Sequence, residues 1–152
     1  MTAIVDFAHN PHGMEALAVT VRRLPARRRL VVIGQAGDRD DVSIRALARS
    51  ALEMRPDRVV VKELTRYLRG REPGEVSGVI RDELRAVAPE LEVVVAGDDL
   101  EAVCAAVGWC AEGDLLVLPV HARRDEVLGW LAMLERTGWR PGMPVPPTPA
   151  PD

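Results

Sequence analysis

The chain has 152 residues, of which 47% are hydrophobic and 28% charged, and its formal net charge is −3. This length favours one domain with a substantial core, and the lack of a basic surplus argues against a nucleic-acid-binding protein. The sequence shows no long apolar run for a membrane span and no secretory signal pattern. Cys104 and Cys110 lie six positions apart on one expected helix, which disfavours a disulfide. We therefore expect a cytoplasmic protein with neither membrane nor nucleic-acid partners.

Apolar runs rich in Val, Ile and Leu alternate with helical patterns along the chain. Such runs are typical of strands buried on both faces, and their alternation with helices favours right-handed βαβ crossovers. The expected strands are 3–7, 30–34, 58–62, 91–96 and 114–120, and the expected helices are 11–23, 41–54, 73–87, 100–111 and 123–137. We predict an α/β fold, a three-layer Rossmann-like domain over residues 1–139 with a mostly parallel sheet of five or six strands. Residues 140–152 hold six prolines and predict an extended, flexible tail.

The end of the first expected strand carries the most informative residues. Residues 6–13 read Asp-Phe-Ala-His-Asn-Pro-His-Gly, so a strand runs into a polar turn and then into a helix that Pro11 can begin. Open α/β sheets bind ligands where their strands end, and the N–H groups at a helix start favour anions. Asp6 could accept hydrogen bonds from ribose hydroxyls, or it could serve only neighbouring backbone N–H groups.

The turn itself is formed by His9 and Asn10. A histidine titrates near neutral pH and could approach a phosphate or an incoming amino acid, and Asn10 could donate to a phosphoryl oxygen. The alternative is that Asn10 caps the helix and that His9 is merely exposed.

Two further polar loops follow the second and third expected strands. Residues 34–40 read Gly-Gln-Ala-Gly-Asp-Arg-Asp, in which the two glycines permit a close backbone approach and Arg39 could hold a carboxylate or phosphate. The third loop carries Arg66, Arg69 and Arg71, which could face an anionic partner. The alternatives are an ordinary turn and a solvated surface loop.

Taken in order, these segments resemble the C-terminal domain of the Mur ligase superfamily, whose members are ATP-dependent amide ligases. Residues 6–13 resemble the motif that opens that domain, residues 34–40 its glycine–Gly-Asp-Arg loop, and residues 62–75 are most similar to the cyanophycin synthetase branch. The similarity extends over about residues 3–134. It departs at His121, because many Mur ligases carry Gly-Lys-Gly-His-Glu near this position and this chain does not.

The resemblance implies a reaction in which ATP with Mg²⁺ phosphorylates a carboxylate and an amine attacks the acyl phosphate. Together with the residues, it predicts nucleotide contacts at Asp6, Gly34, Gly37 and Asp38, catalytic roles for His9, Asn10 and Arg39, and contacts with an amino acid or peptide substrate at Arg66, Arg69 and Arg71. No P-loop precedes Lys62, which is the only lysine in the chain. ATP and Mg²⁺ therefore require an ATPase domain, in cis or in trans, and we expect no activity from this chain alone.

A standalone, non-catalytic module is the alternative function. Such a module would sense a nucleotide or an amino acid, or dock on a separate ATPase subunit, and an apolar patch beside the first loop would favour docking. The histidines and cysteines lack metal-ligand spacing, so no metal site is expected. The sequence leaves the oligomeric state open, and a homo-oligomer is among the options.

Overall fold

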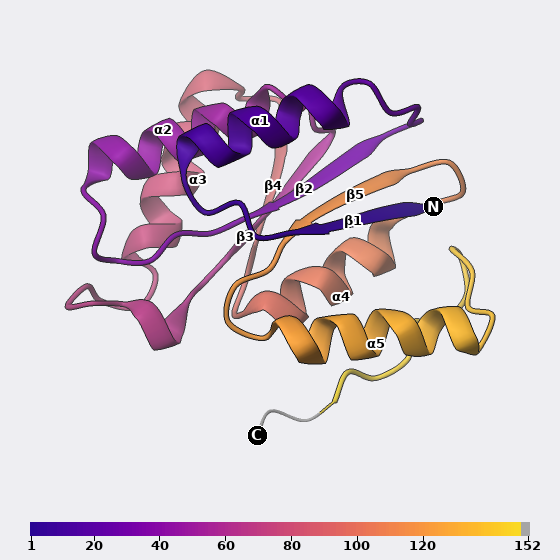
Figure 1. Cartoon of the computed structure of the whole chain (residues 1–152). Coiled ribbons are helices and arrows are strands. Elements are labelled where there is room, and N and C mark those ends of the chain that lie inside the picture. Colours follow the sequence, from indigo (N-terminus) through magenta and orange to yellow (C-terminus); the bar gives the residue numbers. More distant parts are fainter. Residues whose placement is uncertain (150–152) are drawn as a thin grey trace.

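The computed structural model describes residues 1–149 as one five-stranded parallel sheet covered by α-helices (Figure 1). The strands are β1 (Thr2–Asp6), β2 (Arg29–Ile33), β3 (Arg58–Lys62), β4 (Glu92–Ala96) and β5 (Leu115–Pro119). The helices are α1 (Pro11–Val21), α2 (Asp41–Leu52), α3 (Glu75–Val87), α4 (Asp99–Trp109) and α5 (Arg124–Arg136), with a 3₁₀ turn, η1 (Thr65–Tyr67). The predicted three-layer α/β fold is confirmed, with five strands. Within the described residues, no helix has both the length and the hydrophobicity needed to cross a membrane.

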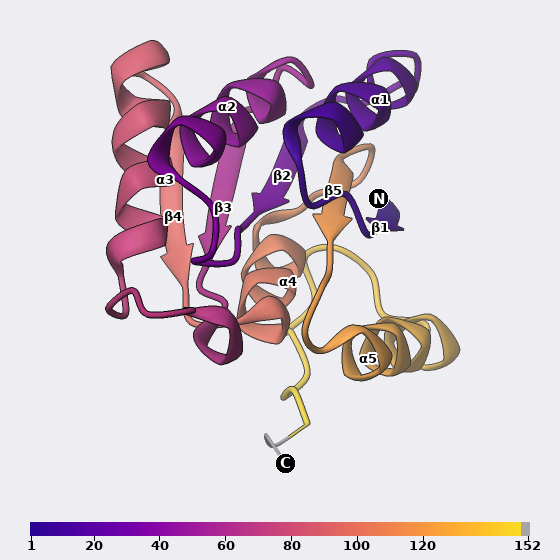
Figure 2. The ribbon, with the colours of Figure 1, turned by 60° about the vertical axis from the view of Figure 1, so that its left-hand side comes forward.

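The strand order is β1-β5-β2-β3-β4, and every pair of neighbours is parallel. The chain moves in one direction across the sheet from β1 to β4 and then returns to insert β5 between β1 and β2. Because βαβ crossovers are right-handed, this reversal puts α1, α2 and α3 on one face and α4 and α5 on the other. Figure 2 shows these two layers, with the arrows of β2 to β5 pointing toward one common edge. That carboxyl edge is where ligands are expected in such a sheet.

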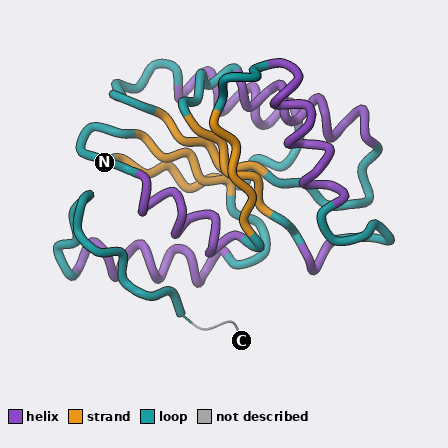
Figure 3. Tube along the Cα trace, turned by 180° about the vertical axis from the view of Figure 1, so that it is seen from behind, coloured by secondary structure: helices purple, strands orange, loops and turns teal. Residues whose placement is uncertain are grey.

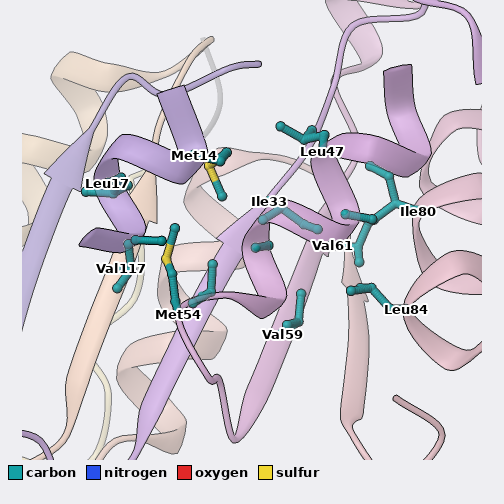
Figure 4. Packing of buried hydrophobic residues seen from close by; sticks show 14 of the residues in the cluster. Met14, Leu17, Ile33, Leu47, Met54, Val59, Val61, Ile80, Leu84 and Val117 are labelled. Carbon is teal, nitrogen blue, oxygen red and sulfur yellow. The ribbon is translucent and has the colours of Figure 1, made fainter. Parts of the chain in front are cut away.

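Two apolar layers hold the helices to the sheet. Alternate residues of each central strand face opposite sides, so Val31 and Ile33 pack toward α1–α3 while Leu30 and Val32 pack toward α4 and α5. Figure 4 shows the first layer, in which Met14, Leu47 and Ile80 of three helices approach the strands. Burial on both faces explains why these strands read as continuous apolar runs.

The proline-rich segment after α5 turns back along that helix (Figure 3). The Trp130 indole N–H donates to the carbonyl of Pro147 over 3.2 Å, and the Trp139 indole N–H donates to that of Pro144 over 3.1 Å. Val145 packs against the α4–α5 core layer. Residues 150–152 of the predicted flexible tail lie outside the described part, and its flexibility stays a prediction.

Replacing Trp130 by Phe should loosen this segment. The variant keeps an aromatic ring in the core but loses the bond to Pro147 and some ring volume, so the free energy of unfolding should fall by about 1–2 kcal/mol. Hydrogen exchange at the Met143 amide, which donates to the Arg140 carbonyl, should accelerate. The more exposed Trp139→Phe change removes the same kind of bond and should have the smaller effect. Unchanged exchange in the Trp130 variant would contradict an anchoring role.

Candidate functional site

A pocket of about 260 Å³ opens at the carboxyl edge of the sheet. It is formed by the loops that follow β1, β2, β3 and β5, so segments far apart in sequence meet there. Its lining residues are Phe7, His9, Gln35, Ala36, Asp38, Arg39, Leu64, Tyr67 and His121. The structure therefore brings together three predicted site residues, His9, Asp38 and Arg39.

Two polar side chains of the first loop form hydrogen bonds to nearby backbone N–H groups. Asp6 Oδ1 accepts the N–H groups of Phe7 (2.8 Å) and Ala8 (2.7 Å). Asn10 Oδ1 accepts the N–H of Gly13 over 2.8 Å and caps α1, which agrees with the capping role that the sequence offered as the alternative for Asn10. Asp6 Oδ2 has no hydrogen-bond partner among residues 1–149, so one oxygen of Asp6 stays open to a ligand. Roles for Asp6 and Asn10 beyond these bonds stay predictions.

Three rings gather at the mouth of the pocket. The Phe7 ring centroid lies 5.3 Å from that of His9 and 5.4 Å from that of His121. Phe7 is 55% exposed. It is the single Phe of a chain that has three Trp residues, so a large aromatic side chain is left at the surface here. The His9 carbonyl accepts a bond from the Gln35 amide over 3.0 Å, which ties the first loop to the second. Phe7 and Gln35 are pocket residues that sequence reasoning missed.

The second loop packs closely against the loop after β3. Gly37 N–H donates to the Tyr67 carbonyl over 2.8 Å, and a Cβ at Gly37 would overlap the Leu68 carbonyl oxygen. Arg71 donates to the carbonyls of Gly37 (3.1 Å) and Arg39 (2.8 Å). Gly37 is therefore required by the approach of two loops, whether or not a nucleotide also approaches there.

The predicted basic residues differ in how far their charges are neutralised. Arg71 forms ion pairs with Asp41 and Glu75, both at 2.8 Å. The Arg39 side chain has no ion-pair partner within residues 1–149 and faces the pocket. Arg69 lies over the Tyr67 ring, with its guanidinium carbon 5.6 Å from the centroid. Arg39 is thus more available to a ligand carboxylate than Arg71.

Arg66 lines a second, smaller pocket of about 180 Å³ next to the first. Leu64 contributes to both pockets. In the second pocket Arg123 is already paired with Asp98 (2.6 Å) and with Glu126. Arg66 has no ion-pair partner within the described residues, so it is the cation in this pocket that could still meet an anion.

A fully buried ion pair between Lys62 and Asp99 underlies both pockets. Lys62 Nζ also donates to the Pro119 carbonyl, and the Lys62 side chain passes over Gly34, where a Cβ would lie 2.6 Å from Lys62 Cγ. Burial lowers the pKa of Lys62, and the Asp99 charge opposes that shift. Burial alone would raise the pKa of Asp99, but the Lys62 charge and backbone N–H groups hold it below its ordinary value.

Asp99 also fixes the loop between β5 and α5. Its Oδ2 accepts the N–H groups of His121 (3.2 Å), Ala122 (2.6 Å) and Arg123 (2.9 Å). His121 Nε2 in turn lies 3.0 Å from the Ala8 carbonyl, with which it bonds as a donor. Desolvation and then the Lys62 charge lower the pKa of His121 to about 4, so its imidazole is neutral at pH 7. Sequence analysis noted His121 only as a departure from a motif.

The helix N-termini at this edge are satisfied by the chain itself. Helices α1, α2 and α4 are capped by the side chains of Asn10, Asp40 and Asp98, which accept the N–H groups of Gly13, Ser43 and Glu101 in that order. The Glu63 carboxylate accepts the N–H of Gly74, directly before α3. The Asp99 carboxylate accepts the N–H of Arg123, directly before α5. A nest of free N–H groups of the kind that cradles phosphates is therefore not found in residues 1–149. Within the same residues no three His, Cys, Asp or Glu side chains are placed to hold a metal ion.

Removing the Asp99 carboxylate should strongly destabilise the fold. Asp99→Ala leaves the Lys62 ammonium buried without a counter-charge and three N–H groups without an acceptor, so the free energy of unfolding should fall by about 3–5 kcal/mol. The matched control is Glu92→Ala, which breaks the more exposed Arg58–Glu92 pair and should cost less than about 1 kcal/mol. Urea denaturation of both variants measures the difference, and equal losses would refute the central role of the buried pair.

His121 should make stability depend on pH. The unfolded chain binds a proton on this residue below about pH 6.5, whereas the folded chain resists it down to about pH 4. The free energy of unfolding should therefore decrease as the pH falls through this window, by at most about 1.4 kcal/mol per pH unit. His121→Gln should make the dependence shallower, and His12→Gln, at an exposed position, should leave it unchanged. Identical pH dependence in the wild type and the His121 variant would contradict this assignment.

Comparison with known proteins identifies the family. Residues 1–119 match the family model described as "Mur ligase, glutamate ligase domain". A cyanophycin synthetase of Trichormus variabilis is 32% identical over 123 residues, which are 80% of this chain and 13% of that protein. A UDP-N-acetylmuramoyl-L-alanyl-D-glutamate–2,6-diaminopimelate ligase of Geobacillus kaustophilus is 32% identical over 118 residues, 77% of this chain and 23% of the relative.

The solved structures agree with this result at the level of the fold. The structure of a UDP-N-acetylmuramoyl-L-alanyl-D-glutamate–2,6-diaminopimelate ligase superposes with a TM-score of 0.61 at 20% identity, covering 76% of this chain and 23% of that one. The chain thus spans less than a quarter of the length of these relatives. It belongs to the Mur ligase family and corresponds to the C-terminal domain of those enzymes.

Proposed function

We propose that this chain supplies the amine-binding half of the active site of an ATP-dependent carboxylate–amine ligase. The observation that carries the proposal is the carboxyl-edge pocket, where the unneutralised Arg39 and the exposed His9 stand around an apolar floor. The substrate is an amino acid or a peptide with a free amine. Such a reaction depends on ATP, and we place it in the cytoplasm.

Each pocket residue has a definite task in this proposal. Arg39 binds the carboxylate of the amine substrate through two parallel hydrogen bonds. His9, at the rim, accepts a proton from the substrate ammonium, because only the neutral amine is a nucleophile. Phe7 and Tyr67 exclude water from the acyl group, and Arg66 in the adjoining pocket meets further negative charge on a longer substrate.

The residues fit only part of an ATP molecule. Asp6 keeps one carboxylate oxygen without a partner, which suits ribose hydroxyls, and Asp38 lies near the same loops. Side chains of the chain itself accept the N–H groups at the helix starts, so these N–H groups are not available to bind phosphates in the described residues. The triphosphate and Mg²⁺, which supply the activating phosphoryl group, would be held by a P-loop ATPase domain, in cis or in trans. This division of labour explains why the chain alone should neither ligate nor hydrolyse ATP.

A titration of the isotope-labelled chain tests the amine-binding role. Amino acids that occupy the pocket should shift the NMR signals of His9, Arg39 and His121, with dissociation constants in the millimolar range because half of the site is missing. Arg39→Ala should weaken binding by about tenfold, the loss expected for one charged hydrogen-bonding group. Arg23→Ala, at an exposed position on the amino side of β2, is the control. Binding that survives the Arg39 change, or rapid ADP release by the pure chain, would contradict the proposal.

One observation favours a second function, docking on a separate ATPase subunit. Phe7, in the first loop, and Tyr67, in the loop after β3, are both exposed and line the same pocket, where an apolar surface would meet a partner. An immunoblot of the source cells separates the two cases. A band near 16.6 kDa would favour docking in trans, and a band several times larger would favour a ligase that carries the domain in cis.

A further inference from the structure

Two tryptophan side chains hold the proline-rich segment, residues 143–149, through their indole N–H groups. Trp130 lies within α5 and is only 3% exposed, and Trp139 follows the end of that helix. The Trp130 N–H donates to the Pro147 carbonyl over 3.2 Å, and the Trp139 N–H donates to the Pro144 carbonyl over 3.1 Å. An indole has one donor and no acceptor. Without the segment, the buried Trp130 N–H would therefore lose its hydrogen bond to the chain.

The two accepting carbonyls are three positions apart in the sequence. A polyproline II helix has three residues per turn, so groups at positions i and i+3 lie on the same side of it, about 9 Å apart. The segment reads Met-Pro-Val-Pro-Pro-Thr-Pro, in which each residue that is not a proline directly precedes one. Proline fixes its own φ and disfavours the helical region for the residue before it. The sequence thus restricts the segment to extended conformations of the polyproline II type, which direct both carbonyls to one side.

One side chain of the segment packs onto the helix layer between the two indole contacts. Val145 is half-buried and lies against the apolar layer of α4 and α5, to which Trp130 and Trp139 also belong. A Cβ at Gly108 of α4 would lie 3.7 Å from Val145 Cγ2, which is already van der Waals contact. A longer side chain at Gly108 would therefore take the place of Val145.

We propose that the face formed by Gly108, Trp130 and Trp139 is a binding site for proline-rich peptides in the polyproline II conformation. Aromatic side chains that receive a preformed polyproline helix are a known mode of peptide recognition. Residues 144–149 occupy the site as an intramolecular ligand, and they define its pattern as Pro-x-x-Pro with an apolar residue after the first proline. A proline-rich segment of another polypeptide would bind in the same way when the chain's own segment is released.

The site is independent of the proposed ligase function. It lies on α4 and α5, and it shares no residue with the carboxyl-edge pocket. Loss of peptide binding would therefore leave the amine-binding proposal untouched, and failure of that proposal would leave this site untouched.

The intramolecular ligand is held by few contacts but is always close at hand. Its bonds to the tryptophans are neutral hydrogen bonds, each of which adds only modestly to stability. The short connection from α5 compensates for this, because a tethered ligand has an effective concentration in the millimolar range. A free peptide therefore competes with the chain's own segment, and a test of binding must first release that segment.

The test begins with the full chain carrying Val145→Asp. This change puts a charge against the apolar layer and leaves Gly108 and both tryptophans intact, so the segment should detach. The Trp130 indole N–H should then exchange about tenfold faster than in the wild type. Size-exclusion chromatography of the wild type should show a monomer, since the ligand is supplied by the same chain.

The probe is the capped peptide Pro-Val-Pro-Pro-Thr-Pro, which has the sequence of residues 144–149. Added to the Val145→Asp chain at millimolar concentration, it should return the indole NMR signals of Trp130 and Trp139 toward their wild-type positions. Trp109 is the internal control, because its ring lies against the Arg28 guanidinium, and its indole signal should shift least.

Two further peptides show which property of the ligand matters. Pro-Asp-Pro-Pro-Thr-Pro keeps the restricted backbone and both carbonyls but loses the apolar side chain. Ala-Val-Ala-Ala-Thr-Ala keeps the apolar side chain and the carbonyls but loses the restriction by proline. Each should bind about tenfold more weakly than the probe, or less.

Two matched substitutions in the protein show where the peptide binds. Gly108→Leu, added to the Val145→Asp chain, fills the place of the peptide valine and should abolish binding. Gly78→Leu is the control, because Gly78 lies in α3 on the opposite face of the sheet and has open space around it. Leu is a better helix former than Gly, so both variants should fold, which circular dichroism checks.

Several results would overturn the proposal. These are unchanged Trp130 exchange in the Val145→Asp chain, no shift of the indole signals at millimolar peptide, equal binding of all three peptides, or full binding by the Gly108→Leu variant. A wild-type dimer whose Trp130 indole stays protected would show that the segment of a second copy fills the site, and would overturn the intramolecular assignment.

Discussion

The buried Lys62–Asp99 ion pair is the constraint on which the carboxyl edge of this domain depends. Two charges without solvent are stable only when their remaining hydrogen-bonding capacity is used, and here the Pro119 carbonyl and three backbone N–H groups use it. The pair thereby joins the ends of β3 and β5 to the start of α4. It also sets the position of His121, which holds the first loop through the Ala8 carbonyl. Gly34 is needed because the Lys62 side chain fills the space that a Cβ would take.

Hydrogen bonds within the chain limit which ligand groups can bind at the carboxyl edge of the sheet. In many open α/β sheets the helix starts at the carboxyl edge hold phosphates. Here Asn10, Asp40, Asp98 and Asp99 already occupy those positions. What remains open is a pocket lined in part by apolar residues, together with the Arg39 guanidinium, which has no ion-pair partner among residues 1–149. The proposed amine-binding role rests on this arrangement.

The sequence predicted the fold well because parallel strands buried on both faces leave a plain signal, such as the run of valines at 59–61. It also predicted His9 and Arg39 as pocket residues, because both directly follow strands. It did not predict His121, Gln35 or Tyr67 as pocket residues, although these also follow strands, because the loops that share one pocket are decided by the strand order, which inserts β5 between β1 and β2. The buried ion pair of Lys62 was not predicted, because its partner Asp99 is 37 positions away in the sequence.

The strand that carries the first loop is an edge strand of the described sheet. β1 pairs only with β5, yet Asp6, Phe7 and His9 follow it directly. The loop is held in place by the bonds from His121 to Ala8 and from Gln35 to His9, which start on β5 and β2 rather than on β1.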